Sequence, residues 1–327
     1  MAQTNLSKVD EYGFERPPNF DYKKQAEFFE NYLSILNRRQ QRWKGLNERE
    51  KNKKTAKLKR FIRKGIPMSE RPMIWMFTSG GQALKDKSKL TYEEMKSLIN
   101  DENLISMIKL DVPRTFPENI FFTKDGVLPK KLFNVCATFA HQNAEVTYCQ
   151  GLNYIAGLLL LATKDEEVTF WLLKALVDNI LPKYYIKTMS GLLTDLAVLD
   201  ELVKLKEPLV HNHLVRMGVE FGVSSTKWFI CLYSEVLPTE TVLRIWDSLF
   251  CEGSKILFRV ALTLIKIHRD DILCTNDFGE VIDCFKRMGH NSQVLNCHSF
   301  MEKIFTMPGS FSSSQLEKLR LKHANTH

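Results

Sequence analysis

Apolar residues recur at helical spacing in segments spread over most of the chain. Four such stripes are Phe28, Phe29, Tyr32 and Leu36; Leu132, Val135, Cys136 and Phe139; Leu196, Leu199, Leu202 and Val203; and Val242, Ile245, Trp246 and Leu249. Side chains three or four residues apart share one face of a helix, whereas the alternation typical of strands is short and rare here. The 15 glycines and 11 prolines among 327 residues fall below the usual share of about 12%. The sequence therefore predicts an all-α fold.

Local signals mark individual helices. Thr91 and Glu94 form a capping box ahead of an apolar stripe, and Pro129 suits the first turn of the next helix. The segment 257–267 is almost entirely apolar, which indicates a buried helix. The longest uncharged run, 146–163, reaches the lower length limit of a membrane span. Its polar residues favour a buried helix of a soluble protein.

Positive charge is concentrated in one segment. The chain carries a net charge of +8, and residues 38–64 hold thirteen Lys or Arg against two acidic residues. The remaining residues are therefore slightly acidic, which disfavours a protein that binds nucleic acid over its whole surface. The segment itself has two interpretations: a solvated helix face that tethers the N-terminal region, or a contact with an anionic membrane.

Cysteine usage and the termini indicate a cytoplasmic protein. The seven cysteines include no C-x-x-C pair, and most have apolar neighbours. No secretory signal opens the chain, residue 2 is Ala, and no prenylation cysteine is present near the end.

Several kinds of enzyme and metal site are excluded by the sequence. Residues 79–82, Ser-Gly-Gly-Gln, do not continue into a phosphate-binding loop, and no G-x-S-x-G elbow exists. His211 and His213 point to different faces of a helix. Cys284, His290, Cys297 and His298 have no common zinc spacing. We therefore expect no cofactor and no metal.

Three short segments carry the residues suited to phosphate chemistry. They are Arg71 to Trp75, Ile108 to Pro117 and Tyr148 to Asn153. Pro113 and Pro117 bracket Arg114, which predicts a loop rather than a helix there. Arg supplies a permanent charge and forked donors for a phosphate oxygen. Each segment also has a structural interpretation: Arg71 and Asp111 as ion-pair partners, Trp75 as core, and residues 150–153 as a helix cap.

In this order the three segments resemble the signature motifs of the TBC family, which activates Rab GTPases. The motifs R-x-x-x-W, I-x-x-D-x-x-R and Y-x-Q-G are all intact, and residues 244–247, Arg-Ile-Trp-Asp, are similar to the recurrent W-D segment. Leu152 replaces the Met of many members. Residues 12–17 and 252–256 further resemble one particular member. The resemblance implies a TBC domain over 65–305, its motifs within 65–255, preceded by an extension at 1–64 and followed by a tail at 306–327.

The resemblance also implies a mechanism. Arg114 would act as an arginine finger, and Gln150 as a glutamine finger that orients the attacking water. Asp111 would orient Arg114 or its loop by ion pairing, and Tyr148 and Gly151 would shape the turn that presents Gln150. Asn153 would be a supporting residue. Arg71 and Trp75 would form scaffold.

The implied partner is a GTP-bound Rab, which itself supplies GTP and Mg²⁺, so the chain is expected to be an activator in membrane trafficking rather than an enzyme. The expected location is cytoplasmic. A peripheral contact with endomembranes follows only from the membrane interpretation of 38–64, and the solvated, tethering interpretation is the preferred one. The alternative is a binding module that recruits a Rab without hydrolysis.

Overall fold

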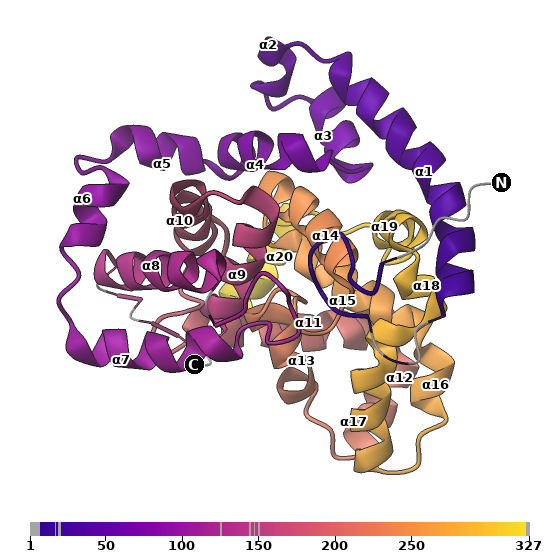
Figure 1. The fold of residues 1–327 in the computed structure, drawn as a ribbon. Helices are drawn as coiled ribbons and strands as arrows, with labels where there is room; N and C mark the ends of the chain where they lie inside the picture. Colours follow the sequence, from indigo (N-terminus) through magenta and orange to yellow (C-terminus); the bar gives the residue numbers. More distant parts are fainter. Residues whose placement is uncertain are drawn as a thin grey trace. The chain divides into compact units, whose positions relative to one another are not determined.

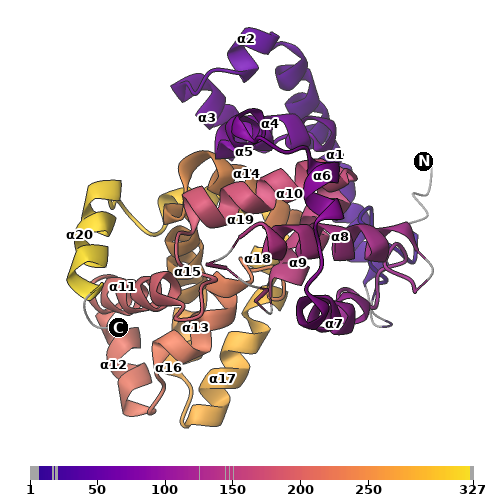
Figure 2. The same cartoon turned by 90° about the vertical axis from the view of Figure 1, so that its left-hand side faces the viewer.

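The computed structural model describes residues 7–16, 18, 21–124, 126–143, 145–146, 148–149 and 151–324. Within these residues the regular secondary structure is helical, apart from two isolated β-bridges, as Figures 1 and 2 show. The predicted all-α fold is confirmed. The chain divides into two compact units: unit 1 comprises Met1–Ala144 and Leu152–Lys174, and unit 2 comprises Glu145–Gly151 and Ala175–His327.

Unit 1 contains the N-terminal helices. They are α1 (Tyr22–Lys44), α2 (Glu48–Lys51), α3 (Ala56–Arg63), the 3₁₀ turn η1 (Met68–Glu70), α4 (Arg71–Ser79), α5 (Gly81–Lys87), α6 (Tyr92–Ser97), α7 (Glu102–Asp111), the 3₁₀ turn η2 (Val112–Arg114), α8 (Val127–His141), α9 (Leu152–Thr163) and α10 (Glu166–Ala175).

The core of unit 1 is built around α9. This helix packs against α8 and α4, and the two helices α8 and α9 lie side by side in Figures 1 and 2. Almost every residue of α9 is buried, including the run Leu158–Leu161. The predicted buried helix at 146–163 is therefore present, although it begins at Leu152. Thr91 caps α6 in a complete capping box with Glu94, as predicted.

The N-terminal region packs onto the rest of unit 1. Phe14 forms a β-bridge with Asn119, and the Trp43 indole donates to the carbonyl of Gly65 over 2.9 Å. Leu58 and Ile62 of α3 are also buried. These contacts tie Phe14 and the end of α1 to residues that follow α3.

Unit 2 contains the remaining helices. They are the π-helical turn η3 (Leu176–Ile180), α11 (Ser190–Lys206), α12 (Pro208–Arg216), α13 (Phe221–Ile230), α14 (Thr239–Glu252), α15 (Lys255–Ile267), α16 (Arg269–Leu273), α17 (Phe278–Arg287), the 3₁₀ turn η4 (Met288–His290), α18 (Ser292–Leu295), α19 (Cys297–Thr306) and α20 (Ser313–His323).

The core of unit 2 is built around α14 and α15. Trp246 of α14 is buried, and its indole donates to the Leu232 carbonyl over 3.1 Å. Nine of the thirteen residues of α15 are buried, as the apolar run 257–267 predicts. The last helix, α20, packs on α11, where Arg320 donates to both oxygens of the buried Asp195 over 2.6 and 2.7 Å.

None of the helices in the described residues is both long enough and apolar enough to span a membrane.

Candidate functional site

Arg114 ends a 3₁₀ turn that continues directly from α7. The loop predicted from the flanking prolines is wrong in this detail, because Pro113 is the second residue of η2. A proline is tolerated at the start of a helical turn, where its missing N–H has no intrahelical partner to lose. The turn ends at Thr115, which has an extended backbone, and Phe116 then adopts a left-handed φ of 53°.

Asp111 holds the Arg114 side chain by an ion pair. The Asp111 carboxylate, in the last turn of α7, accepts from the Arg114 guanidinium. The Asp111 side chain is 7% exposed, whereas that of Arg114 is 54% exposed. A buried acceptor therefore fixes one side of a guanidinium whose other side faces solvent. Because a guanidinium has five N–H donors, this pairing leaves donors for a partner molecule.

Arg71 and Trp75 lie in the interior of unit 1. Both are buried residues of α4, and the Arg71 guanidinium donates to the Tyr12 hydroxyl over 3.3 Å. Their burial prevents direct contact with a partner molecule. This position is consistent with the scaffold interpretation.

The third motif is divided in sequence: residues 148–151 belong to unit 2 and residues 152–153 to unit 1. Gln150 is outside the described residues, whereas Tyr148 is buried in unit 2. Gly151 has a φ of 108°, which side-chain-bearing residues rarely adopt, and a Cβ at this position would lie 3.5 Å from the Cys231 sulfur. Burial raises the pKa of the Cys231 thiol to about 12. This thiol is therefore protonated at neutral pH and is a poor nucleophile.

Asn153 links α9 to the turn that carries Arg114. It is a fully buried residue of α9, and its amide donates to the Thr115 hydroxyl over 2.8 Å. The structure thus brings part of the third motif against the second. Thr115 was not among the predicted site residues. The signal that could have identified it is a hydroxyl residue placed directly after Arg114 between two prolines.

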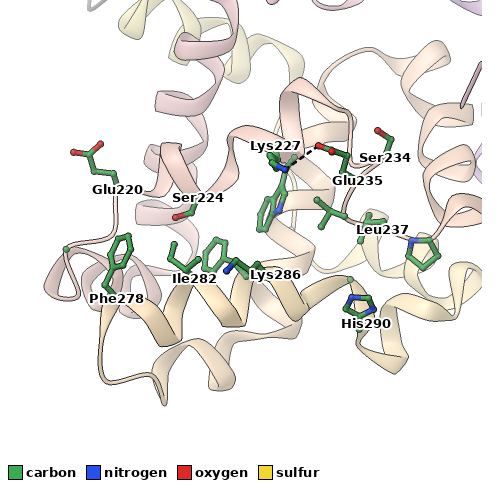
Figure 3. A pocket seen from close by; sticks show the side chains of 16 residues that line it. Glu220, Ser224, Lys227, Ser234, Glu235, Leu237, Phe278, Ile282, Lys286 and His290 are labelled. Atoms are coloured by element: carbon green, nitrogen blue, oxygen red, sulfur yellow. Dashed lines mark ion pairs between the residues drawn. The ribbon is translucent and has the colours of Figure 1, made fainter. Parts of the chain in front are cut away.

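A separate cavity in unit 2 contains none of the predicted site residues. It measures about 830 Å³ and is lined by residues of α13 and α17, among them Lys227 and Ile282 (Figure 3). The rings of Trp228 and Phe285 stack there with their centroids 5.4 Å apart. Lys227 and Glu235 form an ion pair of 3.7 Å at this cavity. The cavity is thus distinct from the turn that carries Arg114.

Comparison with known proteins identifies the family. Residues 68–273 match the model of the Rab-GTPase-TBC domain. The chain belongs to this family. It is 46% identical to growth hormone-regulated TBC protein 1-A of Danio rerio, over 98% of this chain and 90% of that protein. It is 45% identical to the Homo sapiens growth hormone-regulated TBC protein 1, over 97% of this chain and 95% of that protein.

A solved structure shares both fold and sequence with this chain. The Chlamydomonas flagellar RabGAP TBC domain superposes with a TM-score of 0.79 at 33% identity, covering 92% of this chain and 100% of that one. The family resemblance drawn from the three motifs is confirmed. Family membership supports GTPase activation in general and implies a Rab GTPase as the partner.

Proposed function

We propose that this chain accelerates GTP hydrolysis by a GTP-bound Rab, to which it supplies Arg114 and Gln150. The observation that carries the proposal is the Arg114 side chain, which is half-exposed and held by the buried Asp111. Phosphoryl transfer depends on positioning and on stabilising charge, and an arginine finger contributes about 10³–10⁵ in rate in other GTPases. A preoriented guanidinium meets that need because little reorganisation is required when the partner binds.

Gln150 is assigned the second role, that of orienting the attacking water. Its support is the intact Y-x-Q-G sequence and the left-handed Gly151 beside it, which permits a tight turn at this point. In this proposal GTP and Mg²⁺ belong to the Rab, so the chain acts as an activator and not as an enzyme in its own right. The competing function is a Rab-binding module that leaves the hydrolysis rate unchanged.

Single-turnover hydrolysis separates these two functions. Purified Rabs are loaded with GTP and mixed with the full chain, and phosphate release and complex formation are both measured. The proposal expects at least one Rab whose hydrolysis rises by orders of magnitude. A Rab that binds tightly but hydrolyses GTP at its intrinsic rate would instead identify the binding module.

We also propose a peripheral contact between residues 38–64 and an anionic membrane, which would bring the activator to endomembranes. Only two of the thirteen basic residues, Arg39 and Lys51, are buried, so most of the positive charge of the segment lies at the surface. Arg42, Lys53 and Lys54 are exposed and have no ion pair within the described part of the chain. Each basic residue near an anionic leaflet contributes about 1 kcal/mol.

Vesicle binding tests this contact. The full chain should bind phosphatidylserine vesicles in low salt, and changing Arg42, Lys53 and Lys54 to Glu should weaken binding at least tenfold. The control variant changes the exposed Lys89, Lys204 and Lys318 to Glu, which alters the net charge equally. Equal losses in the two variants would show that net charge alone attracts the protein, and the contact would be rejected.

A further inference from the structure

The Thr115 hydroxyl joins α7 to α9. It donates to the carbonyl of Asp111 over 2.9 Å and accepts from the Asn153 amide over 2.8 Å. Thr115 and Asn153 are both fully buried, so water does not replace either bond. A hydroxyl has one proton to donate, and here that proton is directed at the last turn of α7.

The backbone after Arg114 is held in a conformation that is unfavourable on its own. Phe116 has a φ of 53°, which is uncommon for a bulky residue and costs about 1–3 kcal/mol. Its ring packs edge-on against Phe14, Phe122 and Tyr154 at centroid distances of 5.2–5.6 Å. These contacts stabilise the left-handed residue directly behind the turn.

Gly157 allows this segment to approach α9 closely. A Cβ at Gly157 would lie 3.0 Å from the Phe116 ring and 3.1 Å from the Thr115 methyl group. Asn153, Tyr154 and Gly157 therefore form one face of α9, which receives Thr115 and Phe116 together. Because side chains four residues apart lie on the same face of a helix, Asn153 and Gly157 lie one above the other there.

From these contacts we infer that Thr115 and Asn153 are positioning residues, which fix the Asp111–Arg114 pair relative to α9. The inference rests on the proposed role of Arg114 and extends it. The hydroxyl ties the end of α7 to α9, and Asn153 follows the motif glutamine by three residues in sequence. One hydrogen bond thereby connects the turn that bears Arg114 to the first turn of α9. A misplacement of about 1 Å in a catalytic group reduces a rate by up to about 10².

Thr115→Val is the first test, because it removes the hydroxyl while keeping the shape. We expect kcat for hydrolysis by a responsive Rab to fall about tenfold or more, with KM changed by less than threefold. Thr115→Ser restores the hydroxyl and should remain within threefold of wild type. Thr78→Val is the matched control, since Thr78 is buried in α4 of the same unit and its hydroxyl donates to the Ile74 carbonyl over 2.8 Å.

The two hydrogen bonds of the Thr115 hydroxyl, with Asp111 and with Asn153, form a clamp between α7 and α9. Amide hydrogen exchange measures the stability of this clamp without any GTPase. The Thr115 amide donates to the Val112 carbonyl, so its exchange reports on the turn. We expect Thr115→Val and Asn153→Ala to accelerate this exchange at least tenfold, and Thr115→Ser and Thr78→Val to leave it unchanged. If the two variants act on one clamp, the double variant should exchange no faster than the worse single one.

The outcomes separate this inference from the proposed function. Faster exchange without activation of any Rab by the wild-type chain would retain the clamp and reject the proposed function. Unchanged exchange in both Thr115→Val and Asn153→Ala would reject the clamp, whatever the hydrolysis rate. Faster exchange with a wild-type kcat would show a structural role only. If Thr115→Val fails to fold, Asn153→Ala provides both measurements.

Discussion

At the scale of single residues, Arg114 combines an exposed guanidinium with a buried partner. Arg114→Lys should reduce the activation of a responsive Rab by orders of magnitude, because an ammonium lacks the planar fork and the reach of a guanidinium. Binding of the GTP-bound Rab should change much less than the rate, since the lost interaction forms mainly in the transition state. Single-turnover hydrolysis and binding are measured on the same preparation.

The choice of lysine matters for stability. In the sequence Arg114 lies outside every apolar stripe. The sequence alone therefore predicts that replacing Arg114 leaves thermal stability unchanged. The structure shows its ion pair with a carboxylate that is 7% exposed, and removing the cation from a buried carboxylate is destabilising. Lys keeps a cation beside Asp111, so the melting temperature should stay within a few degrees of wild type. Activation within threefold of wild type would exclude Arg114 as a finger.

Replacing Gln150 tests the second proposed finger. Gln150→Ala should remove the orientation of the attacking water while Arg114 still stabilises charge, so the rate should fall strongly and Rab affinity little. Gln150→Glu serves as the companion variant, because it preserves size but replaces the amide donor. A folded Gln150→Ala protein with nearly wild-type activation would assign water positioning to the Rab itself.

At the scale of elements, the C-terminal helix α20 is anchored by an ion pair with a buried carboxylate. Arg320 donates to Asp195 and also to the Ser254 hydroxyl over 2.7 Å, and the Tyr184 hydroxyl donates to the same carboxylate. Arg320→Ala leaves the buried Asp195 without its cation. Breaking such a pair costs about 3 kcal/mol or more, roughly 6–12 °C in the melting temperature of a unit of this size.

Lys322→Ala is the control for α20. Lys322 pairs with Glu201 over 2.8 Å but is 62% exposed, and exposed pairs contribute about 0–1 kcal/mol. Differential scanning calorimetry compares the two variants with the wild-type chain. Equal shifts in melting temperature for Arg320→Ala and Lys322→Ala would contradict the expectation that the pair with the buried Asp195 stabilises the protein more than the exposed pair does.

The helices themselves were largely predictable because their signals are local. Residues 239–252 carry an apolar stripe after Pro238, and they form α14; Thr91 caps α6 through a neighbour three residues away. The contacts that complete the candidate site and those that anchor α20 are not local. Asn153 and Thr115 are 38 residues apart, and Asp195 and Arg320 are 125 apart. No periodicity in the sequence encodes such pairs. The 3₁₀ turn at Pro113 was not predicted because it forms as a continuation of α7, which the two flanking prolines do not indicate.

At the scale of the whole molecule, the N-terminal region is part of unit 1. The positions of the motifs alone predict that deleting residues 1–64 preserves catalysis. The Tyr12 carbonyl, however, accepts from the Asn119 amide over 2.9 Å, and Phe14 packs on Phe116 two residues after Arg114. Deletion also removes the buried Trp43. We now expect the 65–327 fragment to melt at least about 10 °C lower and to activate a Rab poorly.

A second deletion locates the cause of this loss. Removing residues 1–6 retains every contact described for the N-terminal region, so stability and activation should match those of the full chain. Thermal melting and Rab hydrolysis are measured on both fragments. A 65–327 fragment with the full melting temperature and full activity would show that the packing of Tyr12 and Phe14 is dispensable.

The division of the chain into two units also determines which contacts can form first during translation. Residues 145–151 belong to unit 2, although the chain before and after them belongs to unit 1. A ribosome releases the N-terminal part first, and domains form as units during translation. The segment that contains Gln150 is therefore synthesised well before Cys231, the residue against which Gly151 lies. A nascent chain that ends at Lys174 already contains Arg114, Asp111 and Thr115, whereas Gly151 can reach Cys231 only after the second half of the protein is synthesised.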